Sequence, residues 1–174
     1  MNPLAPELET PGLETPEQFV AAMAHAATGV SVVATWGPAG RIARTVSAFA
    51  SISAEPPIVM VSVKDTSPLS LHIQKNGVFS LNILAGDQHP VANLFGRSSP
   101  LPAGQVFSQA EWTDNGSGRH VCLKGAAAAF SCRVSQSLLM GTHRLFFGLV
   151  EQAAAGTAEA LIYHARDYAR PTRF

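Results

Sequence analysis

Short runs of β-branched and aromatic residues follow one another along this chain, and they constrain its fold more than any other feature. Such runs, separated by turns rich in Gly and Pro, predict β-strands. We expect strands over residues 30–36, 41–49, 58–63, 78–84, 126–135, 143–151 and 160–164. Because short turns and short helices join most of them, the pattern favours a mainly β fold with peripheral helices, built as a closed antiparallel barrel.

One helix is expected before the first strand. Thr15 suits the N-cap, Pro16 suits the first helical position, and Gln18 completes a capping box. The apolar residues that follow at helical spacing are predicted to face the core, and they are Phe19, Ala22, Met23, Ala26 and Ala27. Two more short helices are expected over 67–75 and 90–95, and residues 97–119 are expected to form a long loop.

A single domain is expected, because 174 residues fall within the usual size of one domain. Residues 1–14 combine Pro and Gly with acidic residues, which predicts a flexible N-terminal tail before a domain over 15–174. Only 14% of the residues are charged. This low content indicates either apolar surface that is buried between subunits or a surface that is simply rich in alanine.

The charge balance and the missing motifs argue against several classes of function. Lys plus Arg and Asp plus Glu both number 12, so no basic excess favours nucleic-acid binding. No apolar run approaches the ~20 residues of a membrane helix, and residues 1–16 do not resemble a signal peptide. We therefore expect a cytoplasmic protein whose Cys122 and Cys132 are free thiols. The histidines show no metal-ligand spacing, and no Gly-x-Gly-x-x-Gly fingerprint is present.

Polar side chains follow some of the predicted strands. Thr45, Ser47, Ser51 and Ser53 lie in one run, and Ser62, Lys64 and Asn82 lie on or just after the next strands. Hydroxyls, amides and a cation that converge on a groove suit a flat polar heterocycle that carries a phosphate. The pattern alone is more typical of solvated outer faces of barrel strands.

Six segments, in order, resemble motifs of the short-chain flavin reductase family. They are residues 27–33; 45–53 with 55–57; 79–84; 94–97; 123–126 with 132–134; and 141–143 with 146–150. The resemblance covers residues 17 to 170 and implies an antiparallel, Greek-key split β-barrel that binds FMN or FAD as a homodimer. It further implies that NADH or NADPH reduces the flavin, which is often passed to a separate monooxygenase.

The resemblance also implies roles for individual residues. The segment that would line the flavin ring comprises Thr45, Val46, Ser47, Ala48 and Ser51. The residues that would hold the ribityl chain and its phosphate are Ser62, Val63, Lys64, Asn82 and Arg97. His143 would contact the nicotinamide and is the candidate catalytic residue.

Three positions depart from the family pattern. Thr142 stands where the family commonly has Asp, so no carboxylate precedes His143. Ala48 replaces a frequent Ser, and Arg44 replaces an apolar residue. We hypothesise that Arg44 lies by the N1–C2 edge of the flavin and stabilises negative charge on the reduced ring.

Other functions remain open from the sequence. One alternative is an enzyme that keeps its flavin tightly bound and reduces another acceptor, such as a corrinoid. Another is a non-catalytic flavin or haem binder, or a structural dimer on the same barrel. The Thr142 departure keeps this last alternative open.

Overall fold

The computed structural model describes residues 15–96, 103–114 and 121–172. The helices in these ranges are α1 (Pro16–Met23), α2 (Pro68–Asn76), α3 (His89–Leu94), α4 (Ala103–Val106) and the 3₁₀ turn η1 (Phe107–Gln109). The strands are β1 (Thr28–Gly29), β2 (Ser31–Thr35), β3 (Ile42–Val46), β4 (Phe49–Ala54), β5 (Pro57–Lys64), β6 (Val78–Ile83), β7 (Trp112–Asp114), β8 (Val121–Leu123), β9 (Ala128–Met140), β10 (His143–Ala155), β11 (Ile162–His164) and β12 (Asp167–Ala169).

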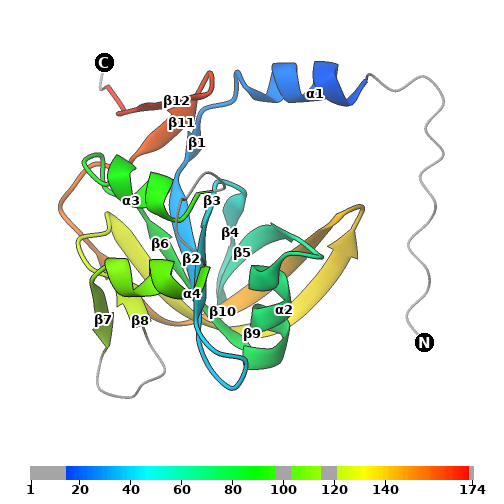
Figure 1. Cartoon of the computed structure of the whole chain (residues 1–174), viewed down its shortest axis with the longest axis vertical. Helices are drawn as coiled ribbons and strands as arrows, with labels where there is room; N and C mark the ends of the chain where they lie inside the picture. Colours follow the sequence, from blue (N-terminus) through cyan, green and yellow to red (C-terminus); the bar gives the residue numbers. More distant parts are fainter. Residues whose placement is uncertain (1–14, 97–102, 115–120, 173–174) are drawn as a thin grey trace.

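The main sheet has seven strands in the order β3-β2-β6-β9-β10-β5-β4, and every neighbouring pair is antiparallel. Its two edge strands, β3 and β4, are consecutive in the chain, so the twisted sheet curls until these edges meet (Figure 1). Beside that junction the Ser62 amide donates to the Ala48 carbonyl at 2.9 Å. The expected mainly β, antiparallel barrel is thus confirmed.

Helices α2 and α3 each cover part of the barrel. Ser67 caps α2, as the sequence predicts, and accepts a bond from the Ser70 amide at 3.2 Å. The interior of the barrel and α2 share one apolar core around Phe79, Phe146 and Ile73. A second core lies beneath α3 and includes Phe95 and Leu161.

Gly148 on β10 is required by the packing of the first core. A Cβ added there would lie 2.5 Å from Cζ of Phe79 and 2.7 Å from Cβ of Cys132. Real Cβ contacts of that length essentially do not occur, and both neighbours are buried. Only glycine therefore lets β10 cross the Phe79 ring at this distance.

Three expectations about secondary structure are wrong. The run expected as one strand over 41–49 ends at Val46, and a separate strand, β4, begins at Phe49 and pairs with β5. Strands β9 and β10 continue beyond residues 135 and 151, to Met140 and Ala155, and form a long hairpin with two register shifts. The turn of the hairpin depends on Gly141, which has a positive φ of 56°. Within residues 97–119, the described part contains α4, η1 and β7, so this segment is not simply a loop.

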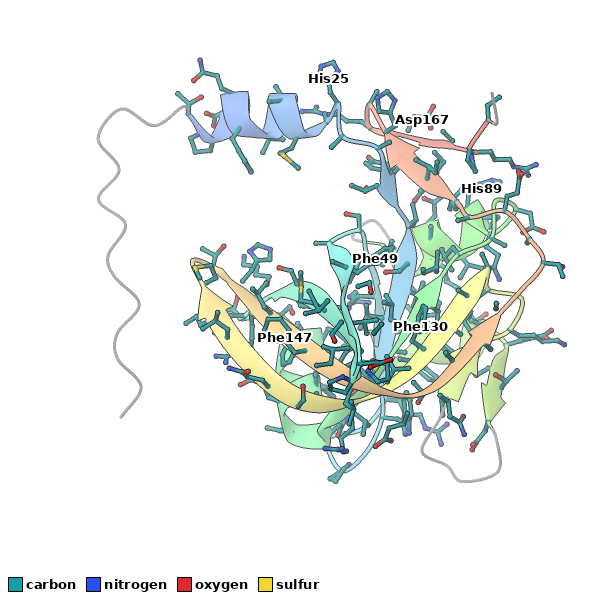
Figure 2. All side chains as sticks on the ribbon, turned by 180° about the vertical axis from the view of Figure 1, so that it is seen from behind. His25, Phe49, His89, Phe130, Phe147 and Asp167 are labelled. Carbon is teal, nitrogen blue, oxygen red and sulfur yellow. The ribbon has the colours of Figure 1, made fainter. Side chains whose placement is uncertain are left out.

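The expected core role of α1 is also wrong within this chain. The Thr15 capping box forms as predicted, but no residue of α1 is buried. Phe19 is 62% exposed and Met23 is 51% exposed. Figure 2 shows α1 projecting away from the barrel, so its apolar face has no partner in the described chain.

The described residues hold neither a membrane-spanning helix nor a cluster of metal ligands. None of the described helices has the length and hydrophobicity to cross a membrane. The described His, Cys, Asp and Glu residues form no group of three that could hold a metal ion. The tail predicted over residues 1–14 lies outside the described residues and stays a prediction.

Candidate functional site: a groove where β3 passes to β4

A groove of about 510 Å³ lies where the chain passes from β3 to β4, and we call it the β3–β4 groove. The end of β5, the start of α2 and the start of β10 complete its walls. Its lining residues are Arg44, Thr45, Val46, Ser47, Ala48, Ser62, Val63, Lys64, Ser67, Leu69, Phe95 and His143. The structure therefore brings together most of the residues that the sequence predicts for the flavin and nicotinamide site.

Hydrogen bonds fix the backbone of this wall. Thr45 is tied to α3 twice, because its amide donates to the Phe95 carbonyl at 3.0 Å and its hydroxyl donates to the Ala92 carbonyl at 2.6 Å. The Ser31 hydroxyl donates to the Val46 carbonyl at 2.5 Å. The next two residues, Ser47 and Ala48, are exposed to the groove. A flat ring placed here would meet backbone that is already held in position.

Cationic groups line the groove, and none of its described lining residues carries a carboxylate. Arg44 and Lys64 come from β3 and β5, and His143 lies opposite Lys64 in the β5–β10 register. Among the described residues Asp65 is the next acidic group along the chain, and it accepts a bond from Arg144 at 2.7 Å. Neither Arg44 nor Lys64 belongs to an ion pair of the described residues. The groove therefore favours an anionic ligand.

The start of α2 adds groups that sequence reasoning missed. Ser67 and Leu69 both line the groove, and Pro68 occupies the first helical position. Pro68 has no N–H, and the Ser70 amide donates to Ser67. Among the described residues, the Leu69 amide is therefore the group of this first turn that is left to meet an anion. The signal was present in the sequence, because Lys64 precedes the Ser67 cap by three residues, but the position of α2 against β3 comes only from the tertiary fold. Phe95, the C-cap of α3, was also missed, because the position of α3 likewise comes only from the tertiary fold.

His143 lies at the mouth of the groove, where it is exposed. Its Nδ1 is 3.0 Å from the Thr142 hydroxyl, and the donor of this contact depends on the imidazole tautomer. Thr142 therefore supplies a neutral partner where the family pattern has a carboxylate. Through this contact it orients the ring.

Two predicted residues lie elsewhere, and a third is not among the described residues. Asn82 is fully buried and uses its amide inside the fold: its nitrogen donates to the Val32 carbonyl at 2.9 Å and to Ser80 Oγ at 3.0 Å, and its oxygen accepts from the Leu123 amide at 2.8 Å. Ser51 is exposed on β4, outside the groove lining. Arg97 lies outside the described residues.

The two cysteines are free, as expected, and neither lines the groove. Burial, with smaller contributions from Cys122 and Glu151, raises the pKa of Cys132 to about 12. Burial also raises the pKa of Cys122. Both are therefore thiols rather than nucleophilic thiolates at neutral pH.

Comparison with known proteins places these features in a family. Residues 23–172 match the family model described as flavin reductase like domain. The chain belongs to the flavin reductase family. It is 36% identical over 153 residues to an FMN reductase (NADH) RutF of Ancylobacter novellus, covering 87% of this chain and 83% of that protein. A RutF of Variovorax paradoxus is 36% identical over 148 residues, which is 84% of this chain and 81% of the relative.

Solved structures of flavin reductases share the fold. A putative flavin reductase from Haemophilus somnus 129PT aligns with a TM-score of 0.84 and 31% identity, over 91% of this chain and 100% of that one. BorF, the flavin reductase component of a bacterial two-component tryptophan halogenase, aligns with a TM-score of 0.80 and 29% identity, over 90% and 99%. The resemblance inferred from the six motifs is thus confirmed.

Proposed function

We propose that this protein is an NADH-dependent flavin reductase that acts on FMN, with FAD as the second candidate. The observation that carries the proposal is the β3–β4 groove, which joins rigid backbone and hydroxyls to Arg44, Lys64 and the start of α2. This donor set fits a flat heterocycle with a dianionic phosphate. The 36% identical relatives named FMN reductase (NADH) support the choice of flavin and of hydride donor.

Each wall of the groove has a proposed task. The backbone of residues 45–48 faces the flavin ring, and Lys64, Ser67 and the Leu69 amide bind the phosphate. His143 positions the nicotinamide, because hydride transfer requires the two rings to be stacked in register. The bound flavin supplies the hydride acceptor, so the protein contributes orientation and charge.

The proposal is tested by following NADH and NADPH oxidation with and without added FMN, FAD or riboflavin. Oxidation of NADH that depends on added FMN is the expected result. A yellow protein that turns over only with another acceptor would instead indicate a tightly bound flavin. Binding of flavin without reduction would show a non-catalytic binder and would contradict the proposal.

We further propose that the reduced flavin leaves for a partner oxygenase or halogenase, and that the protein is a cytoplasmic homodimer. The flavin reductase components of a tryptophan halogenase and of styrene monooxygenase support the first proposal. The apolar side chains that α1 and the β9–β10 hairpin tip leave exposed support the second, and they are Phe19, Val20, Met23, Leu138, Leu139 and Met140. An eight-residue helix with no buried side chain is not stable by itself in water, which supports a second copy of the chain as its cover.

Charges placed on α1 are expected to separate the dimer. The double substitution Phe19→Asp and Met23→Asp should convert the dimer to a monomer at micromolar concentration, because burial of each side chain contributes about 1.5–3 kcal/mol. Light scattering after size-exclusion chromatography measures the mass. Glu17→Gln, on the same helix, is the matched control and should remain dimeric. A double variant that stays dimeric would exclude α1 from the interface.

Arg44→Ala is expected to lower the two-electron midpoint potential of bound flavin by about 30 mV, which corresponds to tenfold in the reduction equilibrium. Arg44 lines the groove without an ion-pair partner among the described residues, so its charge remains available to the reduced ring. Spectroelectrochemical titration measures the potential. Arg44→Lys retains the charge and should stay near the wild-type value, whereas an unchanged potential in Arg44→Ala contradicts the role.

A further inference from the structure

A second hollow adjoins the β3–β4 groove, and we call it the tyrosine pocket. It has a volume of about 540 Å³ and shares Thr45 and Ser47 with the groove. Its other walls are Val30, residues of α3 and the turn after it, Tyr163 of β11 and Tyr168 of β12. A ligand that lies in the groove can therefore extend into this pocket across the Thr45–Ser47 wall.

The two hollows differ in charge. The charged residues Arg44 and Lys64 line the groove, whereas none of the described residues that line the tyrosine pocket is charged. Most of the pocket wall is apolar, with Val30, Pro90 and Leu94 among its members. The pocket thus suits an uncharged, flat part of a ligand whose charged part lies in the groove.

The tyrosines present aromatic surface in a fixed arrangement. Their ring centroids are 5.5 Å apart at an interplanar angle of 64°, so the edge of one ring meets the face of the other. The Tyr168 hydroxyl donates to Asn93 Oδ1 at 3.0 Å, which locks that ring against α3. Tyr163 is 38% exposed and lines the pocket, so its ring is accessible to a stacking partner.

Asn93 makes the pocket suited to adenine among flat rings. It lines the pocket beside the tyrosines. Its Oδ1 already accepts the Tyr168 hydroxyl, but the second lone pair of that oxygen and the Nδ2 donors remain, and this combination of donor and acceptor matches the edge of adenine. Aromatic stacking on a base adds affinity for any base, and the amide adds the preference.

We propose that the tyrosine pocket binds the adenine ring of a dinucleotide whose phosphates lie towards the β3–β4 groove. The inference rests on the proposed function, since a flavin reductase meets two adenine-bearing dinucleotides, FAD and NADH. Both would place an adenine ring in the pocket. Comparing the binding of each dinucleotide with that of its mononucleotide shows which of the two occupies it.

For this comparison, dissociation constants are measured for FMN and FAD by flavin fluorescence, and KM values are measured for NADH and for reduced nicotinamide mononucleotide. Tyr163→Leu is expected to weaken one dinucleotide by roughly 5- to 100-fold, the loss expected for one stacked base. The matching mononucleotide should change less than twofold. Tyr163→Phe retains the ring and should behave as wild type.

Each outcome decides the proposal. A loss confined to FAD assigns the pocket to the flavin, and a loss confined to NADH assigns it to the hydride donor. Equal losses for dinucleotide and mononucleotide, or no loss in either pair, overturn the proposal. Tyr163→Met, which removes the aromatic face and keeps an apolar side chain, repeats the test if Tyr163→Leu does not fold.

A failure of the proposed reductase function can be distinguished from a failure of the adenine proposal. If the wild-type protein does not oxidise NADH in a flavin-dependent way, calorimetric titration with ADP-ribose still measures the pocket. Binding of ADP-ribose that Tyr163→Leu weakens, and Tyr163→Phe does not, would sustain the pocket without the reductase. Absence of ADP-ribose binding, together with equal affinities for FMN and FAD, would overturn it.

Discussion

Lys64→Ala is expected to weaken FMN binding by about tenfold or more while leaving riboflavin binding within twofold. Lys64 lines the β3–β4 groove with no ion-pair partner among the described residues, and it lies next to the start of α2. A charge-assisted bond to phosphate contributes about 1.5–3 kcal/mol, and the exposure of Lys64 favours the lower end. Riboflavin lacks the phosphate, so the difference between the two ligands isolates this contact.

The measurement is a fluorescence titration of both flavins at two ionic strengths. The FMN affinity of the wild type should fall with salt more steeply than that of the variant, because one phosphate contact is missing in the variant. Lys75→Ala, which removes an exposed lysine from the other end of α2, is the matched control. If Lys64→Ala binds FMN as the wild type does, the phosphate lies elsewhere.

Asn82→Ala is expected to lower the free energy of unfolding by about 3 kcal/mol or more. The substitution leaves the Leu123 amide and the Val32 carbonyl without the Asn82 partner inside the fold. Each buried polar group left unsatisfied costs about 1–3 kcal/mol, and the lost side-chain volume adds a cavity. Urea denaturation at matched protein concentration measures the change.

The same variant distinguishes a structural role of Asn82 from a flavin contact. If its role is structural, the folded fraction of Asn82→Ala should bind FMN with nearly unchanged affinity. Ser51→Ala, at an exposed predicted site residue, should change stability by less than about 0.5 kcal/mol. A large loss of FMN affinity in folded Asn82→Ala would show instead that the side chain reaches the ligand.

The sequence predicts the elements of this fold well where local chemistry decides them. The Thr15 and Ser67 caps, the β2–β3 hairpin and the strand over 78–83 follow from capping residues, turns and β-branched runs. The ends of β9 and β10 do not follow from local chemistry, because residues 136–140 are in a strand only through their pairing with β10. The apolar spacing of α1 indicates a face to be buried, but it carries no information on which chain buries it.

The lining residues of the groove also divide into those that the sequence predicts and those that only tertiary packing brings in. Residues 44–48 and 62–64 are contiguous in the chain, so motifs identify them, and the fold brings them together. Ser67, Leu69 and Phe95 enter through the placement of α2 and α3, which is a matter of tertiary packing. Asn82 is the opposite case, because the sequence predicts it for the site and the fold places it elsewhere. Its hydrogen-bond partners come from β2, β6 and β8, so this side chain connects strands in the interior and is not part of the groove wall.

The two bonds from Thr45 to α3 have a consequence for the timing of binding. They hold the wall between the groove and the tyrosine pocket with groups of the protein itself. The donors belong to Thr45 on β3, and the acceptors are the carbonyls of Ala92 in α3 and of Phe95, its C-cap. The wall is therefore ordered before any ligand arrives, and little conformational entropy is lost there when a ring docks. Under the proposed function the flavin enters and leaves in every catalytic cycle, and a rigid surface favours this exchange because the protein need not refold around the ring.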